Sequence, residues 1–272
     1  MTTSGGRFIG FESCSRILPS TNCHFCSMSD PLVLVTGASG FLGRHVVKVL
    51  QEKGYRVRGT VRSLKNAKRV EHLYNLCPNA KFKLELVEAD LTKDETWLDA
   101  VEGCTYIHHV ASPFPLEDVN RDEEIIGPAI QGTLGVMKAA AKTGMVKRIV
   151  LTSSSSAVGF VGGNKDPRTE KDWTNINDKG ISAYPKSKVL AEKAAWEFVA
   201  NLPENEKFEL AVINPVFILG PVLQGSGGTS FEIIQQILMK EVPVVPHFNL
   251  GVCDVRDVAE AHLRCMTLPE AV

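Results

Sequence analysis

Three glycines that interrupt an apolar run near the start of the chain constrain its fold more than any other feature. The run covers residues 32–36, the glycines are Gly37, Gly40 and Gly43, and apolar residues return at helical spacing over residues 42–50. Glycine permits a tight turn, a close approach of backbone N–H groups to a ligand, and close packing of a helix on a strand. A turn that binds nothing is the alternative. The pattern predicts a phosphate-binding turn between a strand and a helix, made of Gly37, Ser39, Gly40, Phe41, Leu42 and Gly43.

The next strand-like segment, residues 55–61, indicates which dinucleotide this turn would hold. A fold that prefers NAD places an acid near the end of this strand, about 20 residues beyond the glycines, to bind the ribose 2′-hydroxyl. No acid lies between Lys53 and Val70, and Arg62 stands at the end of the strand. A guanidinium suits a 2′-phosphate, so the sequence predicts NADP, bound by Arg62 with support from Arg69. The lysines between these arginines fit a solvated helix face.

A tyrosine and a lysine at helical spacing are candidate catalytic residues. Tyr184 and Lys188 lie four residues apart near the start of a helical pattern, which places their side chains on one face. A neighbouring ammonium stabilises a phenolate, so Lys188 is expected to lower the pKa of Tyr184 and make it usable as a general acid. The same spacing arises by chance in many helices, and it gains meaning from its position after the glycine turn.

A third segment, residues 148–152, has the pattern of a buried strand and leads into four consecutive serines, Ser153 to Ser156. Parallel sheets of α/β proteins present the C-terminal ends of their strands to ligands. One of these serines is therefore expected to hydrogen-bond the substrate oxygen. An ordinary polar loop is the alternative, and the residues alone leave Ser153, Ser154 and Ser155 open for this role.

From about residue 32 onward, the chain resembles the extended short-chain dehydrogenases/reductases of the NAD-dependent epimerase/dehydratase family, closest to the dihydroflavonol reductase-like branch. The segments that carry the resemblance are 36–43, 60–62, 88–91, 109–113, 152–154, Tyr184 with Lys188, and 214–221. The resemblance implies that Ser154 is the catalytic serine, with Ser155 as the alternative. It also implies further cofactor contacts, in which Asp90 and Leu91 lie at the adenine, Ala111 and Ser112 line the dinucleotide groove, Tyr184 and Lys188 approach the nicotinamide ribose, and Pro215 and Val216 flank the nicotinamide.

The same residue set serves several reactions. The favoured function is an NADPH-dependent reduction of the carbonyl group of a small aldehyde, ketone or flavonoid-like substrate, with Ser154, Tyr184 and Lys188 as catalytic residues. The first alternative is a sugar-nucleotide epimerase or dehydratase, or a 3β-hydroxysteroid dehydrogenase, and Arg62 counts against the versions that retain NAD. The second alternative is a catalytically impaired, cofactor-binding regulatory form.

The composition of the chain limits the classes of partner that it is expected to bind. The chain has 272 residues and a formal net charge of −1, which gives no general attraction to nucleic acid. No apolar run approaches the ~20 residues that span a bilayer. Seven scattered cysteines indicate free thiols in a reducing compartment, here the cytoplasm, and Cys23 with Cys26 lacks the second pair that a zinc site needs. No metal is expected, and the resemblance leaves a homodimer open.

Apolar strand-like runs alternate with helical stretches along most of the chain. The runs are 32–36, 55–61, 82–88, 104–110, 147–152 and 209–213, and they predict an α/β fold with a doubly wound parallel sheet. We expect a disordered extension over residues 1–30, a dinucleotide-binding domain over 31–220 to which 158–181 adds substrate-side structure, and a partial substrate lobe over 221–272. Relatives continue past the equivalent of Val272, so the lobe is expected to be shortened. His262 is expected to be a packed helix residue.

Overall fold

The computed structural model describes residues 30–65, 70–113, 122–159, 168–225, 227–241 and 251–272. Its centre is a six-stranded sheet in the order β3-β2-β1-β4-β5-β6, and every neighbouring pair in this sheet is parallel. The strands are β1 (Leu32–Thr36), β2 (Arg56–Val61), β3 (Glu85–Glu88), β4 (Tyr106–His109), β5 (Arg148–Thr152) and β6 (Glu209–Ile213). The strand order reverses beside β1, which is the arrangement of a doubly wound dinucleotide-binding sheet. The predicted fold class and all six predicted strands are confirmed, with the largest shift at the start of β3.

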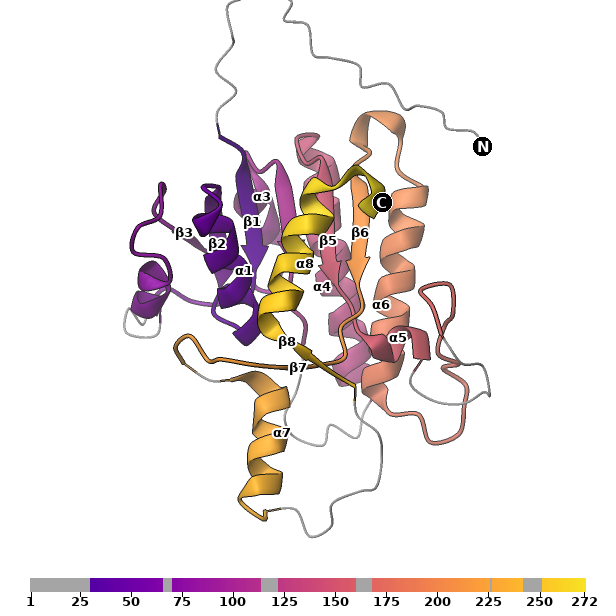
Figure 1. Cartoon of the computed structure of the whole chain (residues 1–272). Coiled ribbons are helices and arrows are strands. Elements are labelled where there is room, and N and C mark those ends of the chain that lie inside the picture. The colour runs from indigo at the N-terminus through magenta and orange to yellow at the C-terminus, as the bar shows by residue number, and fades with distance from the viewer. Residues whose placement is uncertain (1–29, 66–69, 114–121, 160–167, 226, 242–250) are drawn as a thin grey trace, which may run out of the picture.

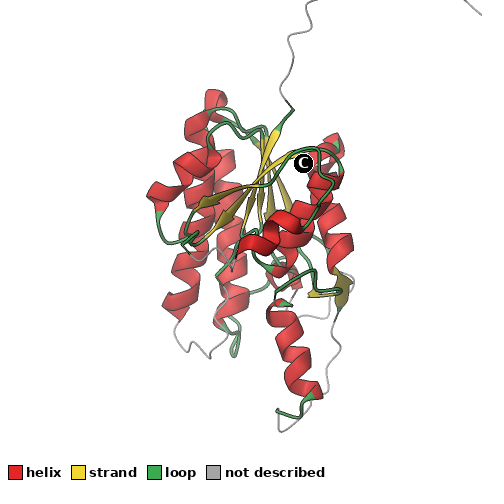
Figure 2. Ribbon diagram, turned by 90° about the vertical axis from the view of Figure 1, so that its left-hand side faces the viewer, coloured by secondary structure: helices red, strands yellow, loops and turns green. Residues whose placement is uncertain are grey.

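Helices cover both faces of the sheet, as Figures 1 and 2 show from two sides. One face carries α1 (Phe41–Glu52) and α8 (Val255–Thr267), and the other carries α3 (Trp97–Val101), α4 (Asp122–Thr143) and α6 (Ala183–Ala200). Along β1, Val33 and Val35 pack toward α1, whereas Leu32 and Leu34 pack toward α4. A parallel strand covered on both faces needs apolar residues at every position, which is why this run shows no polar alternation.

Helix α8, which lies in the segment expected to form a partial substrate lobe, packs on the main sheet. Its buried residues Val258, Ala259 and Met266 join the core shared with α1. His262 is fully buried, and its Nδ1 and Nε2 lie 3.1 Å from His108 Nδ1 and 3.0 Å from Thr152 Oγ1. Burial lowers the pKa of His262 to about 3, so the ring is neutral at ordinary pH. The expectation that His262 is a packed residue is confirmed.

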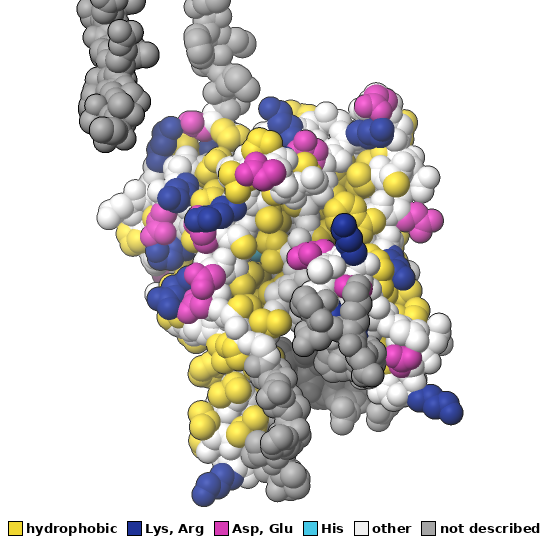
Figure 3. All heavy atoms as spheres, turned by 45° about the vertical axis from the view of Figure 1, so that its right-hand side comes forward, with side chains coloured by type: hydrophobic (Ala, Val, Ile, Leu, Met, Phe, Trp, Pro, Cys, Tyr) yellow, Lys and Arg dark blue, Asp and Glu magenta, His cyan; other side chains and the backbone are white. Residues whose placement is uncertain are grey.

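A smaller unit lies beyond the C-terminal edge of the main sheet. It consists of β7 (Phe217–Leu219), α7 (Gly228–Leu238) and β8 (Val252–Asp254), with β7 and β8 paired in parallel. We call the described residues between 217 and 254 the β7–α7–β8 unit. Helix α7 projects away from the sheet in Figure 1, and hydrophobic side chains gather on this projection in Figure 3. Phe231, Ile233 and Leu238 on α7 are 41%, 40% and 75% exposed.

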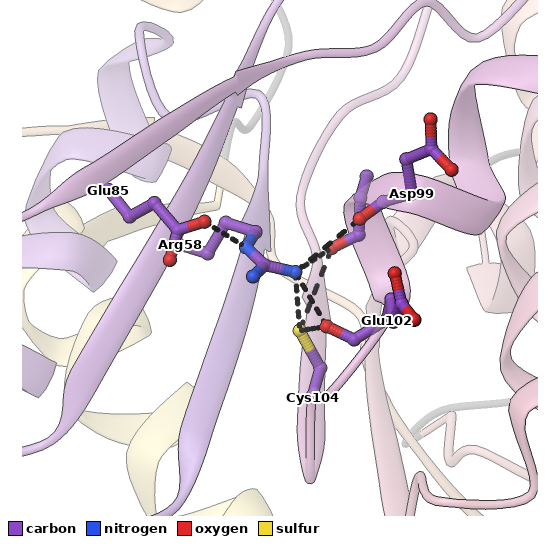
Figure 4. Close-up of polar contacts among 6 residues, drawn as sticks. Arg58, Glu85, Asp99, Glu102 and Cys104 are labelled. Carbon is purple, nitrogen blue, oxygen red and sulfur yellow. Dashed lines mark hydrogen bonds and ion pairs between the residues drawn. The ribbon is translucent and has the colours of Figure 1, made fainter.

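Arg58 ties β2 to β3 and to the end of α3 (Figure 4). From β2 its Nε donates to Glu85 Oε1 of β3 at 2.8 Å, and its Nη1 donates to the carbonyl oxygens of Ala100 and Glu102 at 3.0 and 2.7 Å. These carbonyls belong to the C-terminal end of α3, which has no further helical turn to satisfy them. Arg58 therefore acts as a structural cap, and its charge is not available to a cofactor.

The remaining short helical segments are η1 (Glu71–Asn75), η2 (Asp94–Thr96), α5 (Ser155–Gly159), η3 (Glu204–Glu206) and η4 (Pro269–Ala271). Thr174 is buried beside α5, where its hydroxyl donates to the Ser156 carbonyl oxygen at 2.8 Å. Part of the segment 158–181 therefore lies next to the serine run. Among the described residues, no helix combines the length and hydropathy that crossing a membrane requires.

Candidate active site

The glycine turn between β1 and α1 is closed by backbone contacts. Gly37 has a φ of +66°, and its carbonyl oxygen accepts from Gly40 N at 2.9 Å. A Cβ added at Gly43 would lie 2.2 Å from the Gly37 carbonyl oxygen, so a larger residue would force the turn open. Gly37 thus needs glycine for its backbone conformation and Gly43 needs it for close packing. These are the roles that the sequence predicts.

The N-terminus of α1 supplies the donors that a pyrophosphate requires. Its N-cap residue Gly40 makes no side-chain hydrogen bond to the helix, and the first turn contains no acid. The first N–H groups of a helix lack partners within the helix, and the helix dipole favours an anion there. A side chain at Gly40 would also crowd the turn, since its Cβ would lie 3.1 Å from the Gly37 carbonyl oxygen. The residues present therefore fit a dinucleotide pyrophosphate.

Two threonines outside the predicted site hold this turn in place. Thr60 Oγ1 on β2 accepts from Gly37 N at 3.0 Å. Thr36 Oγ1 accepts from Val110 N and Ala111 N, both at 3.0 Å, and lies 3.0 Å from His109 Nδ1. The sequence indicates this role by a threonine near the C-terminal end of each of the two neighbouring strands. A threonine hydroxyl there can hydrogen-bond backbone groups that no longer pair within the sheet.

Arg62 and Asp90 lie at the tips of neighbouring strands. Arg62 is exposed and follows β2 directly. Asp90 Oδ1 accepts from the N–H and hydroxyl of Thr92, and these hydrogen bonds, with a smaller contribution from Arg62, hold the pKa of Asp90 below its usual value. An ionised carboxylate near an exposed guanidinium suits an adenosine whose ribose carries a phosphate. Arg69, the predicted support for Arg62, lies outside the described residues.

Ser154 and Tyr184 are brought together from β5 and α6. Ser154 is buried just beyond β5, and Tyr184 lies in the first turn of α6, where Pro185 is tolerated because the first N–H groups need no helical partner. A side-chain hydrogen bond with Ser154 opposes the increase that burial causes in the pKa of Tyr184. The buried hydroxyl of Ser153, by contrast, has no hydrogen-bond partner in the described structure. This geometry favours Ser154 among the three candidate serines.

Lys188 lies one turn after Tyr184 and is almost fully buried. Its Nζ donates to Ser112 Oγ at 2.9 Å and lies 5.7 Å from the centre of the Tyr184 ring. Burial lowers the pKa of Lys188 to about 8, while Glu192 on the next turn opposes that decrease. The ammonium is therefore charged at neutral pH and faces the strand ends.

The expected direction of the Tyr184 pKa is wrong for this structure. The sequence predicts that Lys188 lowers it, whereas burial raises it and Ser154, not Lys188, opposes the increase. Removing a phenol from water penalises its charged form more than a cation several ångströms away stabilises it. Tyr184 is consequently protonated at neutral pH, which is the state that a proton donor needs.

One groove collects the predicted positions along the C-terminal edge of the sheet. Its volume is about 1330 Å³, large enough for a dinucleotide with a small substrate. It is lined by Ser154 and by every predicted cofactor residue that the structure describes, namely Gly37, Ser39, Gly40, Phe41, Leu42, Gly43, Arg62, Asp90, Leu91, Ala111, Ser112, Tyr184, Lys188, Pro215 and Val216. Ser230 and Ile233 of α7 line it from the opposite side.

Two further polar residues near this groove lie outside the predicted site. Glu192 is buried on α6, and Asn214 follows β6, where its Nδ2 donates to Glu192 Oε2 at 2.8 Å. An acid four residues after Lys188, on the same helix face, was the available signal. No group of three or more metal-ligating side chains occurs within the described ranges, and Cys23 and Cys26 lie outside them.

Comparison with known proteins places the chain in a family. Residues 33–272 match the model of the NAD dependent epimerase/dehydratase family. The chain belongs to this family. Among its relatives, a cinnamoyl-CoA reductase of Medicago truncatula is 38% identical over 237 residues, which cover 85% of this chain and 71% of the relative. A dihydroflavonol 4-reductase of Arabidopsis thaliana is 41% identical over 199 residues, covering 71% of this chain and 51% of that protein.

A solved structure has a similar fold. The yeast methylglyoxal/isovaleraldehyde reductase Gre2, solved in complex with NADPH, superposes with a TM-score of 0.73 at 31% identity, covering 89% of this chain and 75% of that one. The predicted membership of the extended short-chain dehydrogenases/reductases, near dihydroflavonol reductase, is confirmed by these relatives.

Proposed function

We propose that this chain is an NADPH-dependent reductase that converts the carbonyl group of a small aldehyde, ketone or flavonoid-like substrate to an alcohol. The observation that carries the proposal is the single groove that holds the glycine turn, Arg62 and the Ser154–Tyr184–Lys188 group. Support comes from relatives named as reductases, one of them solved with NADPH.

Different residues of the chain would bind different parts of the cofactor. The glycine turn and the N-terminus of α1 would hold the pyrophosphate, Asp90 and Leu91 the adenine, and Arg62 the 2′-phosphate. Lys188 and Tyr184 would hold the nicotinamide ribose, between a wall of Ala111 and Ser112 and a wall of Pro215 and Val216. The chemistry that the reduced nicotinamide supplies when bound is a hydride for the carbonyl carbon.

Ser154 and Tyr184 act on the carbonyl oxygen. Each presents a hydroxyl to the same place in the groove, so each donates a hydrogen bond to the oxygen as negative charge develops on it. Tyr184 then gives its proton to that oxygen, which forms the O–H bond of the alcohol, and the phenolate takes a proton back from solvent. Lys188 stabilises the transient phenolate because its ammonium lies near the ring.

Oxidation of NADPH by the purified chain tests this function. The loss of NADPH absorbance would be followed with aliphatic and aromatic aldehydes, ketones and a dihydroflavonol, with NADH as the comparison cofactor. We expect turnover of a carbonyl compound with NADPH in preference to NADH. Turnover of nucleotide sugars, or of a 3β-hydroxysteroid with NAD, would replace the proposal with the corresponding alternative. Binding of NADPH without turnover of any compound would indicate a catalytically impaired form.

Compartment and association also belong to the proposal. We place the protein in the cytoplasm because the cysteine count is odd and because Cys77, Cys104, Cys253 and Cys265 are free thiols in the described structure. Fractionation of cells that express the tagged protein would test the compartment. A homodimer stays a prediction, and light scattering of the purified protein would test it.

A further inference from the structure

A buried carboxylate lies behind the proposed active site, on the same helix as Tyr184 and Lys188. Glu192 follows Lys188 by one turn of α6 and is only 4% exposed. Its Oε2 accepts from Asn214 Nδ2 at 2.8 Å, and its Oε1 lies at the 3.5 Å limit of a hydrogen bond from Trp196 Nε1. A buried carboxylate costs several kcal/mol unless its partners compensate, and an apolar residue of similar volume would often serve stability as well. Its partners therefore indicate what Glu192 does.

The partner Asn214 connects α6 to the serine run. The same Nδ2 that donates to Glu192 also donates to the Ser154 carbonyl oxygen at 3.2 Å. On either side, Ser153 N donates to the Ile213 carbonyl oxygen at 2.8 Å and Ser155 N to the Pro215 carbonyl oxygen at 2.9 Å. The backbone of Ser154 is thus fixed against residues 213–215, and Glu192 fixes that segment to the helix that carries Tyr184.

Glu192 also faces Lys188 across a small cavity. The cavity has a volume of about 10 Å³, enough for about one water molecule. Its lining includes Lys188, Glu192, His109 and Ser153, whose buried hydroxyl has no partner in the described structure. The carboxylate and the ammonium therefore line one small, mainly apolar cavity without direct contact, and attraction between them acts through a medium that screens charge less than bulk water.

We propose that Glu192 is a positioning residue of the reductase: through Asn214 it fixes Ser154 relative to Tyr184, and its negative charge holds the ammonium of Lys188 inside the protein. This inference rests on the proposed function, because it assigns Glu192 to the support of that same site. Ser154 and Tyr184 come from different elements, so both can hydrogen-bond the transition state only if the distance between those elements is fixed. Misplacement of about 1 Å can cost about 100-fold in rate.

The charge balance around Lys188 makes the second part of this role measurable. Among the described residues, three titratable groups face Lys188, namely Tyr184 and Glu192 on α6 and His109 on β4. His109 is neutral because burial lowers its pKa to about 3, and Tyr184 is neutral because burial raises its pKa. Glu192 alone among these three favours the charged form of Lys188. Lys188 is charged below its pKa, so activity that needs the ammonium falls as pH rises through about 8.

Two substitutions separate the effect of the hydrogen bond from Asn214 to Glu192 from the effect of the negative charge of Glu192. Glu192→Gln keeps an oxygen that accepts from Asn214 but removes the negative charge. We expect the alkaline limb of kcat/KM against pH to move to lower pH by about one unit. Burial lowers the pKa of Lys188, and in this variant no negative charge at residue 192 opposes that decrease. Glu192→Leu removes both the bridge and the charge. We expect kcat to fall by about 10- to 100-fold at every pH, with a smaller change in the KM of the substrate.

Glu197→Gln is the matched control, since Glu197 is exposed on the same helix and the substitution makes the same chemical change. It should move neither kcat nor the limb. The proposal would be overturned if the alkaline limb of kcat/KM against pH lay at the same pH in Glu192→Gln as in wild type. It would also be overturned if the kcat of Glu192→Leu were within about twofold of the wild-type value. If thermal melting shows that Glu192→Leu does not fold, the limb of Glu192→Gln alone decides.

A binding readout distinguishes failure of this inference from failure of the proposed function. If the wild-type chain reduces no carbonyl compound, the proposed function fails, and the dependence of NADPH affinity on pH still reports on Lys188. Fluorescence titration of NADPH should show affinity that falls as pH rises through the Lys188 pKa. The midpoint of that fall should lie at lower pH in Glu192→Gln than in wild type or Glu197→Gln, and identical midpoints would overturn the role of the charge.

Discussion

The main sheet and the β7–α7–β8 unit face each other across one groove, but they are built in different ways. Strands of the main sheet are covered on both faces, and Val33, Leu34 and Val35 of β1 are fully buried. In the β7–α7–β8 unit, Phe231, Ile233 and Leu238 are each at least 40% exposed, and the two short strands form a separate sheet. Each proposed catalytic or phosphate-binding side chain comes from the main sheet and its helices, whereas the smaller unit supplies groove walls.

This difference has a physical cause. Positions that must hold a transition state need neighbours that are already fixed by packing, and the strand ends of a buried parallel sheet provide them. A wall that meets substrates of different shape gains less from such packing. We therefore expect substitutions in the main sheet to alter rate and stability strongly, and substitutions in α7 to alter the choice of substrate.

The largest expected effect comes from removing one oxygen at the junction of α6 with β5. Tyr184→Phe should lower kcat by about 10²- to 10⁴-fold, because the transition state loses its proton donor. NADPH affinity should change little, since the phenol acts mainly on the substrate. Ile233→Ala on α7 should instead raise the KM of the substrate by at most about tenfold with kcat nearly kept. Steady-state kinetics with a fluorescence titration of NADPH would measure both, and a Tyr184→Phe variant that keeps a tenth of the wild-type rate would contradict the assignment.

The next effect concerns stability. Leu34 on β1 is 0% exposed and Leu238 at the end of α7 is 75% exposed. Leu34→Ala should lower the free energy of unfolding by about 2–5 kcal/mol, through lost burial and the cavity left behind. Leu238→Ala should change it by less than about 0.5 kcal/mol. Denaturant unfolding of both variants checks the contrast, which would disappear if the two free energies fell equally.

A smaller effect separates a glycine required by packing from one that is not. Gly43→Ala would place a Cβ 2.2 Å from the Gly37 carbonyl oxygen, whereas a Cβ at Gly127 on α4 would meet nothing within 4 Å. Gly43→Ala should cost about 1–3 kcal/mol of stability and weaken NADPH binding, because the turn must open. Gly127→Ala should change stability by less than about 1 kcal/mol and leave NADPH affinity unchanged. Equal NADPH affinity in the two variants would show that the turn does not hold the cofactor.

The smallest effect concerns cofactor choice. Arg62→Gln should reduce the preference for NADPH over NADH by about tenfold, since a charge-assisted hydrogen bond to phosphate is worth about 1.5–3 kcal/mol. Arg56→Gln removes the same charge at the opposite end of β2, where the side chain is exposed, and should leave the preference as it was. Calorimetric titration of both cofactors measures the ratio. A loss of preference in both variants would point to general charge attraction and away from a 2′-phosphate site.

Several features of this protein follow from its sequence alone. The turn at residues 37–43 is predictable because glycine is the residue type that tolerates its φ values and close contacts. Strand β1 is predictable because a strand buried on both faces must be apolar throughout. The parallel direction of the strands then brings Ser154, Tyr184 and Lys188 to one groove at their C-terminal edge. These are local requirements of the backbone and of burial, and a single chain displays them directly.

Other features were decided only by the tertiary structure. Helix α8 follows the small sheet in sequence, but its apolar face packs beside α1 on the same face of the main sheet, which no local pattern reveals. The raised pKa of Tyr184 reflects desolvation by neighbours distant in sequence, and it reverses the direction expected from Lys188 alone. The bridge from Glu192 through Asn214 to Ser154 joins three segments whose separation is set by strand order. Sequence spacing specifies which side chains share a helix face, whereas the packing of the sheet determines what that face meets.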